Sequence, residues 1–238
     1  TVSGSEYGIH LDFNSNGNTI RDNTIQNSGN VGMFLHSSAG NSAGNNTISD
    51  SGQNGILCDY GSTGNTFSGN SLSGNMYGLN IGHESNGNTL KDNWVNGSSV
   101  HSIYILSSRS NSIYNNFFYG APAGIGGSES TNTWNIAKSS GTNIIGGPYY
   151  GGNFWGTPAN QGFSDTTADN DGDGLCDSSF ALGFGYQPEN RDYLPLHQYP
   201  PRYYTLFRTT TGENWVFSKV LGSVEYRDSY GLSTDLPL

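Results

Sequence analysis

Short apolar segments recur through the first half of the chain at a nearly constant spacing. Each repeat begins with an alternating phrase, as in Gly-Ile-His-Leu at residues 8–11 and Gly-Met-Phe-Leu at residues 32–35. Two shorter phrases follow, and each joins an asparagine to an apolar residue two positions later. The first asparagine recurs at positions 18, 41, 65, 88 and 111, so the period is 23 or 24 residues. A fixed period of this length is typical of a solenoid.

Alternating apolar and polar positions in the first phrase predict a strand with one buried face. Three strands and three turns fit each repeat, so we expect an all-β fold, a right-handed parallel β-helix of about six rungs. Rungs stacked about 4.8 Å apart place equivalent positions above one another. The predicted interior columns are Ile9, Met33, Ile56, Leu79 and Ile103; Leu11, Leu35, Cys58, Ile81 and Ile105; Ile20, Ala43, Phe67, Leu90 and Ile113; and Ile25, Ile48, Leu72, Val95 and Phe118.

The repeated asparagines are expected to form amide ladders at the bends. Asparagine tolerates a left-handed turn, and its amide can bond to the same group one rung away. A row of amides that binds glycans is the alternative. The repeated glycine is interpreted as a turn residue. We expect the β-helix to occupy residues 1–150, followed at 151–197 by a Gly- and aromatic-rich segment that carries an aspartate-rich loop. The stretch 137–162 is expected either to close the end of the stack or to start a flank.

Composition limits the class of protein and its partners. Hydrophobic residues make up 33% of the 238 residues and charged residues 12%, while aromatic residues reach 13%, which is unlike a disordered chain. The net charge of −10 argues against nucleic-acid binding and suits a surface that binds cations. No segment is long and apolar enough to span a bilayer. Because Thr1 lies just before a full repeat, we expect a mature or truncated piece of a longer precursor.

The segment 169–177, Asp-Asn-Asp-Gly-Asp-Gly-Leu-Cys-Asp, is the sharpest chemical motif of the chain. Alternating carboxylates, a glycine at the sixth position and a carbonyl at the seventh are typical of a calcium loop. The match to an EF-hand is partial, because Phe180 stands where a glutamate is usual. An acidic loop without metal is the alternative, although clustered carboxylates with nothing basic nearby would repel one another. The predicted ligands of a structural Ca²⁺ are Asp169, Asp171, Asp173, the Leu175 carbonyl and Asp177.

These features together resemble a known family. The repeats of residues 7–136, the Gly-Gly-Asn-Phe-Trp phrase at 151–155, the aspartate loop and the Asp-Tyr-Leu-Pro-Leu phrase at 192–196 are similar to NosD-like right-handed β-helix proteins of archaeal, methanogen-type cell surfaces. The resemblance covers roughly residues 7–197. It implies an extracellular or envelope location and a structural or carbohydrate-related role. Copper delivery, attached to some bacterial members, is not expected, because the sequence has no Met-rich or His-rich cluster.

An outward column just after the first strand of each repeat is the best candidate for catalysis. Asp12, His36 and Asp59 hold equivalent positions in successive repeats, where they could bind a metal or act as acid and base on a sugar. Charge compensation on a solvated wall is the alternative. His83 and His101 are interpreted as scattered surface residues.

The two cysteines are too few for a disulfide scaffold. Cys58 is expected to be a small buried hydrophobe. Cys176, in the aspartate loop, is expected to be exposed, where it could link two molecules. The last part of the chain, residues 198–238, is expected to form two or three aromatic-rich strands. These strands would either pack on the solenoid wall or donate an edge to a neighbouring subunit.

Three functional hypotheses follow from these observations. The first is a structural, extracellular protein of the cell envelope, an S-layer, sheath or filament subunit that self-assembles and is stabilised by Ca²⁺. The second is a polysaccharide lyase, hydrolase or epimerase that acts on the side wall and uses Asp12, His36 and Asp59. The third is a carbohydrate-binding adhesin module that uses exposed aromatic residues such as Phe34, Tyr60 and Tyr104. The first hypothesis is favoured, so an enzyme is the less expected outcome.

Overall fold

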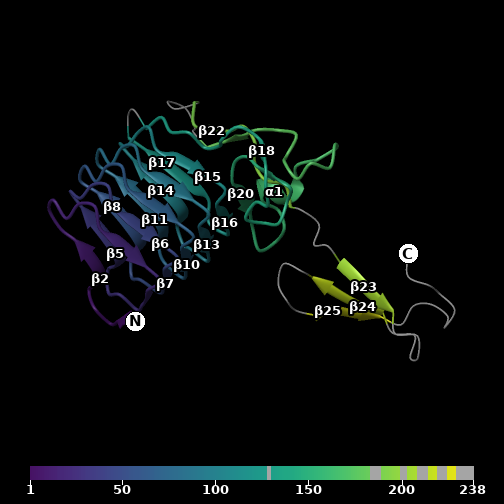
Figure 1. Ribbon diagram of the computed structural model, residues 1–238, viewed down its shortest axis with the longest axis horizontal. Coiled ribbons are helices and arrows are strands. Elements are labelled where there is room, and N and C mark those ends of the chain that lie inside the picture. Colours follow the sequence, from purple (N-terminus) through teal and green to yellow (C-terminus); the bar gives the residue numbers. More distant parts are fainter. Residues whose placement is uncertain (128–129, 183–188, 199–202, 208–213, 219–223, 229–238) are drawn as a thin grey trace. The chain divides into compact units, whose positions relative to one another are not determined.

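The computed structural model describes residues 1–127, 130–182 and 189–198, and the backbone of three strands at 203–207, 214–218 and 224–228. The chain forms two compact units, residues 1–198 and residues 199–238. The first unit is a solenoid built almost entirely of short parallel strands (Figure 1).

Three parallel sheets, here called A, B and C, form the walls of the solenoid. Sheet A consists of β1 (Val2–Ser3), β4 (Thr24–Gln26), β7 (Thr47–Ser49), β10 (Ser71–Ser73), β13 (Trp94–Asn96), β16 (Phe117–Tyr119) and β20 (Phe154–Gly156). Sheet B consists of β2 (Tyr7–Leu11), β5 (Val31–His36), β8 (Asn54–Asp59), β11 (Tyr77–Gly82), β14 (His101–Leu106) and β17 (Ala123–Gly126). Sheet C consists of β3 (Thr19–Arg21), β6 (Ser42–Gly44), β9 (Thr66–Ser68), β12 (Thr89–Lys91) and β15 (Ser112–Tyr114).

Each repeat contributes one strand to each sheet, so the sequence period is one turn of the solenoid. Five turns are complete. A sixth is formed by β17, by an isolated parallel bridge between Ser112 and Thr133, and by β20. The predicted parallel β-helix of about six rungs is therefore confirmed. Because β20 extends sheet A, the segment after residue 150 continues the solenoid.

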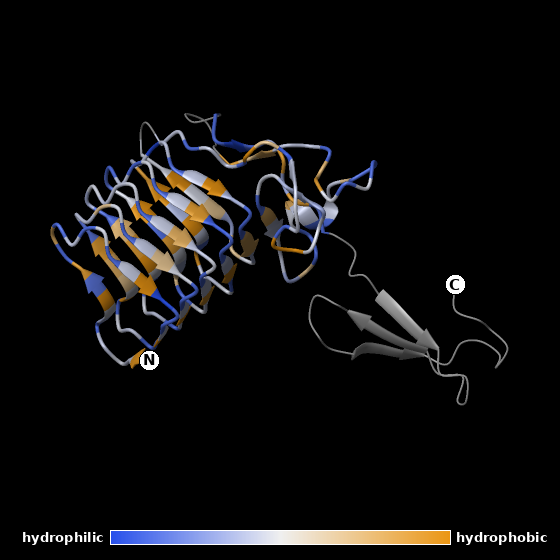
Figure 2. Ribbon diagram, viewed as in Figure 1, coloured by the Kyte–Doolittle hydropathy of each residue, from blue (hydrophilic) through white to orange (hydrophobic). Residues whose placement is uncertain are grey.

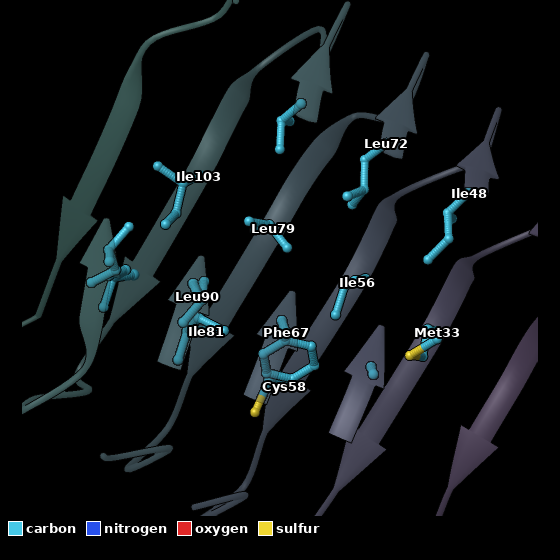
Figure 3. Packing of buried hydrophobic residues seen from close by; sticks show 14 of the residues in the cluster. Met33, Ile48, Ile56, Cys58, Phe67, Leu72, Leu79, Ile81, Leu90 and Ile103 are labelled. Carbon is cyan, nitrogen blue, oxygen red and sulfur yellow. The ribbon is translucent and has the colours of Figure 1, made fainter. Parts of the chain in front are cut away.

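The strand registers confirm all four predicted interior columns. Ile9 pairs with Met33, Met33 with Ile56, Leu79 with both Ile56 and Ile103, and the other columns follow the same pattern. Most of these side chains are fully buried, and Figure 3 shows them stacked between the strands. The apolar residues follow the strands and the polar residues follow the turns (Figure 2). One rung cannot bury this surface alone, so neighbouring rungs stabilise one another.

The repeated glycine has a different role from the one predicted. Gly32 and its equivalents lie inside the strands of sheet B, and their φ angles are not in the left-handed region. A Cβ atom on Gly32 would lie 2.3 Å from Ile48 Cγ2 and 2.7 Å from the Gly55 carbonyl oxygen. The Ile48 side chain of the same turn and the Gly55 backbone of the next turn leave no room for a side chain at Gly32, so the interpretation as a turn residue was wrong.

The asparagines form two hydrogen-bonded ladders along the solenoid, as predicted. In each ladder the backbone N–H of one asparagine donates to the side-chain Oδ1 of the next, at 2.7–3.1 Å. The amides in the middle of both ladders are buried. They satisfy backbone groups at the bends that would otherwise be left unpaired. The ladders run through Asn18, Asn41, Asn65, Asn88, Asn111 and Asn132, and through Asn23, Asn46, Asn70, Asn93, Asn116 and Asn153.

Both ladders end on one later segment, which we call the ladder cap and which consists of Asn190 and Asp192. Asn190 Oδ1 accepts the backbone N–H of Asn132 at 3.0 Å, and Asp192 Oδ2 accepts that of Asn153 at 2.8 Å. Each cap residue also accepts an indole N–H, from Trp134 and Trp155 respectively. The cap therefore joins the end of the solenoid to a segment 37–58 residues further along the chain.

Smaller elements surround the last turns. They are β18 (Ser139–Ser140) paired with β19 (Tyr149–Tyr150), β21 (Phe180–Ala181) paired with β22 (Arg191–Asp192), and the one-turn helix α1 (Phe163–Thr166). In the second unit, the backbones of β23 (Tyr203–Phe207), β24 (Asn214–Ser218) and β25 (Val224–Asp228) form an antiparallel sheet, which confirms three strands. The segments that connect these strands, 208–213 and 219–223, lie outside the described residues.

Candidate functional site

The outer face of sheet B gathers imidazoles, carboxylates and aromatic rings near the first turns of the solenoid. The register of β2 and β5 places Asp12 beside His36, because Leu11 pairs with Leu35 one residue earlier. His36 Nδ1 lies 2.8 Å from Asp12 Oδ1, within hydrogen-bonding distance. His10, on the same side of β2 as Asp12, brings Nε2 to 3.9 Å from that same oxygen. Donor atoms of His10, Asp12 and His36 all lie within 4.8 Å of one another.

Aromatic rings hold these imidazoles in place. The His10 ring stacks on Phe34 with centroids 4.8 Å apart and an interplanar angle of 8°. Phe34 also stacks on His36, which is flanked by Phe13 and Tyr60 at 4.5 and 4.8 Å. The two imidazoles are thus packed against neighbouring aromatic rings on the outer face of the sheet.

The third member of the predicted column has a different partner. Asp59 is adjacent to His36 in the register, but its Oδ1 lies 2.7 Å from His83 Nδ1. The Asp59 side chain is only 9% exposed, whereas that of Asp12 is 51% exposed. The predicted Asp12–His36–Asp59 column is therefore resolved into two Asp–His pairs. His83 is exposed, as predicted, but it is not scattered, because it belongs to the second pair.

This arrangement bears on the enzymatic hypothesis without testing it. An Asp–His pair can serve as an oriented general base, and Asp12–His36 has the geometry for that role. Asp59 is buried beside Tyr60 and His83, so its carboxylate is far less accessible than that of Asp12. Glycan cleavage by the Asp12–His36 pair stays a prediction.

The aspartate loop forms a second cluster, with a membership slightly different from the predicted one. Carboxylate oxygens of Asp169, Asp171 and Asp177 lie within 4.8 Å of one another. Asp173 turns away from them, because one of its oxygens is paired with Lys138. The other Asp173 oxygen accepts the backbone N–H of Leu175. The oxygens of Asp169 accept the N–H groups of Asp173 and Gly174, which tightens the loop.

Two basic residues lie close to this loop, contrary to the expectation that nothing basic would be nearby. The Lys138 ammonium pairs with Asp173 and lies 4.4 Å from the centre of the Tyr149 ring. The hydrogen bond to Asp173 raises the pKa of Lys138 above its ordinary value. His197 Nδ1 lies 3.8 Å from Asp169 Oδ2. Both residues are distant from the motif in sequence, so inspection of the motif alone does not reveal them.

Both cysteines are free and buried. Burial raises the pKa of the Cys58 thiol far above its usual range, and it raises the pKa of Cys176 to about 12. Thiolate is the reactive form, so neither group is activated as a nucleophile. The expectation that Cys176 would be exposed was wrong, because its thiol lies 3.6 Å from the Leu196 carbonyl oxygen and the neighbouring Leu175 forms a bridge with Leu196.

The solenoid half of the chain matches a known protein family. Residues 1–160 match the family described as periplasmic copper-binding protein (NosD). The chain belongs to the NosD family. The matched residues include the whole solenoid and β20, while the aspartate loop and Asp192 of the ladder cap lie beyond them. No curated protein and no solved structure shows significant similarity to the chain.

The two clusters of this NosD-family chain suit different ions. Two imidazoles and one carboxylate are the donors that Cu²⁺ and Zn²⁺ prefer, so His10, Asp12 and His36 fit the copper named in the family description. The oxygen-only donors of the aspartate loop suit a hard cation such as Ca²⁺ instead. The repeat pattern did not reveal the first cluster, because His10 lies two positions before the column of Asp12 and His36, and no other repeat has a histidine at that position. Within the part of the chain that the structure describes, no helix is long and apolar enough to cross a bilayer.

Proposed function

We propose that this protein is a non-catalytic structural component of the cell envelope that self-assembles outside the cytoplasm and is stabilised by Ca²⁺. The family description supports a location outside the cytoplasm, since it names a periplasmic protein. The observation that carries the structural role is the attachment of the aspartate loop to the end of the solenoid. An ion bound in that loop would strengthen the whole closing segment.

The attachment consists of a short series of backbone contacts. Leu175 forms an antiparallel bridge with Leu196, and Cys176 donates its N–H to the Pro195 carbonyl. Leu196 in turn donates to the carbonyl of Asn153, the last asparagine of one ladder. Three carboxylates that converge without an ion repel one another, so Ca²⁺ would remove a strain on this segment.

The calcium proposal is tested by thermal unfolding in Ca²⁺ and in EGTA. We expect Ca²⁺ to raise the melting temperature, because an ion that binds only the folded state adds about 2.7 kcal/mol at 100 times its dissociation constant. Asp171→Asn should abolish the response. Glu6→Gln, which removes an exposed carboxylate at the other end of the solenoid, is the matched control. Equal melting temperatures with Ca²⁺ and EGTA in the wild type, and no calcium in the purified protein, would contradict the proposal.

Self-assembly is supported by large exposed rings beside sheet B. Phe13 and Tyr60 are 64% and 55% exposed, and both rings contact His36. Exposed apolar groups that lie together indicate a contact surface. Electron microscopy and sedimentation of the wild type in Ca²⁺ should reveal ordered arrays or filaments. A strictly monomeric protein at high concentration would count against this role.

A second candidate function is non-catalytic carbohydrate binding on the same wall. Phe34 and Tyr104 lie in the same outward column of sheet B, and Tyr77 lies 5.7 Å from Tyr104 between ring centroids. Rings spaced along a wall offer faces on which successive sugar rings could stack. Binding on a glycan array that Phe34→Ala and Tyr104→Ala abolish would favour this function. Tyr193→Ala, which removes an exposed ring outside the wall, should leave binding unchanged.

A further inference from the structure

We propose that His10, Asp12 and His36 form a binding site for one divalent transition-metal ion of the Cu²⁺ or Zn²⁺ class. The site lies on the outer face of sheet B, at the first two turns of the solenoid. It is separate from the aspartate loop and is not needed for the proposed structural role.

The solenoid places the three donors by its own regularity. His10 and Asp12 are two residues apart along β2 and its end, so their side chains point to the same face of the sheet. His36 ends β5 at the position equivalent to Asp12. The distance between the donors is thus set by the spacing of the paired strands β2 and β5, which the hydrogen bonds of sheet B hold together. Ligands on such rigid elements are positioned more accurately than ligands on loops.

The donors are also close and accessible. Asp12 Oδ1 lies 2.8 Å from His36 Nδ1 and 3.9 Å from His10 Nε2, and all three donor atoms fit within 4.8 Å. Two bonds of about 2.0–2.2 Å to one ion place the ligand atoms at most about 4.4 Å apart, and about 3.4 Å apart in a tetrahedral site. The exposed Asp12 and His10 side chains therefore need to close by only a small movement. Their exposure leaves further coordination positions open to water or to another ligand.

The chemistry of the donors selects the class of ion. Imidazole nitrogen suits Cu²⁺ and Zn²⁺, whereas Ca²⁺ takes oxygen ligands. The stacked Phe34 ring and the adjoining Phe13 and Tyr60 rings hold the imidazoles without competing for the ion. The neighbouring Asp59–His83 pair lacks such a third donor. In the repeat of Asp59, the position equivalent to His10 is occupied by Leu57, which cannot bind a metal.

The experiment titrates ZnSO₄ into the full chain, purified without a histidine tag and held in millimolar Ca²⁺, by calorimetry. A parallel titration with CuSO₄ is followed by electron paramagnetic resonance. We expect one tight ion per chain and a Cu²⁺ spectrum with two nitrogen ligands. His10→Ala and His36→Ala should each weaken binding by at least about 100-fold, since even loss of an outer-shell partner costs about 10–100-fold.

Matched controls separate this site from others. His83→Ala removes the imidazole of the neighbouring two-member pair and should leave both titrations unchanged. His10→Gln and His36→Gln provide a second set that retains polar side chains, and circular dichroism verifies that each variant is folded. Asp171→Asn should abolish the calcium response while transition-metal binding persists. The proposal is overturned if the wild type binds neither ion tightly, or if folded His10 and His36 variants bind as well as the wild type.

Discussion

At the scale of single residues, the asparagine amide and the aspartate carboxyl group, which have nearly the same shape, have different roles in the ladders. The buried asparagines are hydrogen-bonded along the two ladders, and one of these ladders ends where an aspartate takes the place of the asparagine. Asp192 is fully buried, and burial raises its pKa to about 7, even though hydrogen bonds from Asn153 and Trp155 favour the charged form. The ladder cap thus contains a carboxyl group that titrates near neutral pH.

A pH dependence of stability follows from this carboxyl group. The folded chain takes up a proton at Asp192 near pH 7, whereas the unfolded chain takes it up only near 3.8. Stability from this group therefore rises as the pH falls from about 8 to about 4, by on the order of 4 kcal/mol. Asp192→Asn should flatten this part of the curve in urea unfolding, measured in EGTA so that the calcium loop is constant. Parallel curves for the variant and the wild type would refute the assignment.

At the scale of the elements, close approach of successive rungs determines which residues the strands accept. Gly32 of β5 shows such a limit, since the Ile48 side chain of its own turn and the Gly55 carbonyl of the next turn occupy the space of a Cβ. Gly29, three residues earlier, has open surroundings, because a Cβ atom there would lie 3.7 Å from its nearest neighbour, Glu6 Cα. The two glycines therefore differ in packing although they are close in sequence.

This difference predicts opposite outcomes for two identical substitutions. Gly32→Ala should destabilise the solenoid by about 1–3 kcal/mol, because an overpacked site must shift its neighbours. Gly29→Ala should be neutral or stabilise the protein by up to about 1 kcal/mol, because it reduces the freedom of the unfolded chain. Chemical denaturation of both variants provides the comparison. A Gly32→Ala variant as stable as Gly29→Ala would show that the rungs can separate.

The elements also show which parts of the structure were accessible from sequence. The interior columns and ladders repeat every 23 or 24 residues, so local periodicity was enough to place Met33, Phe67 or Asn70. The Asp59–His83 pair was missed because His83 is one position later than the column, in the turn. The ladder cap was missed because Asn190 and Asp192 lie outside any repeat. Lys138 was missed for the same reason, since only the fold brings it to Asp173.

At the scale of the whole molecule, the chain consists of two compact units, and the candidate sites all belong to the first. Residues 1–198 contain the solenoid, the ladder cap, the aspartate loop and the His10–Asp12–His36 cluster. Solenoids gain their stability from contacts between neighbouring turns. The first unit therefore holds the interactions that its own folding requires.

A shortened chain tests this statement. Residues 1–198 alone should unfold cooperatively, with a melting temperature within a few degrees of the full chain and with an unchanged response to Ca²⁺. Differential scanning calorimetry of the two proteins is the direct measurement. A shortened chain that aggregates or lacks a cooperative transition would mean that residues 199–238 complete the fold.

The ladder cap bears on how repeats can be added to a solenoid of this kind. Within each ladder every asparagine after the first both receives a hydrogen bond at its side chain and passes one on from its backbone N–H, so one more repeat can be inserted without leaving any member unsatisfied. An ionised Asp192 accepts from Asn153 and Trp155 and has no side-chain hydrogen to donate. The other ladder ends on Asn190, whose amide still donates to the Ser130 carbonyl. A repeat inserted before the cap would therefore lengthen the solenoid by one turn and leave both ends of the ladders as they are.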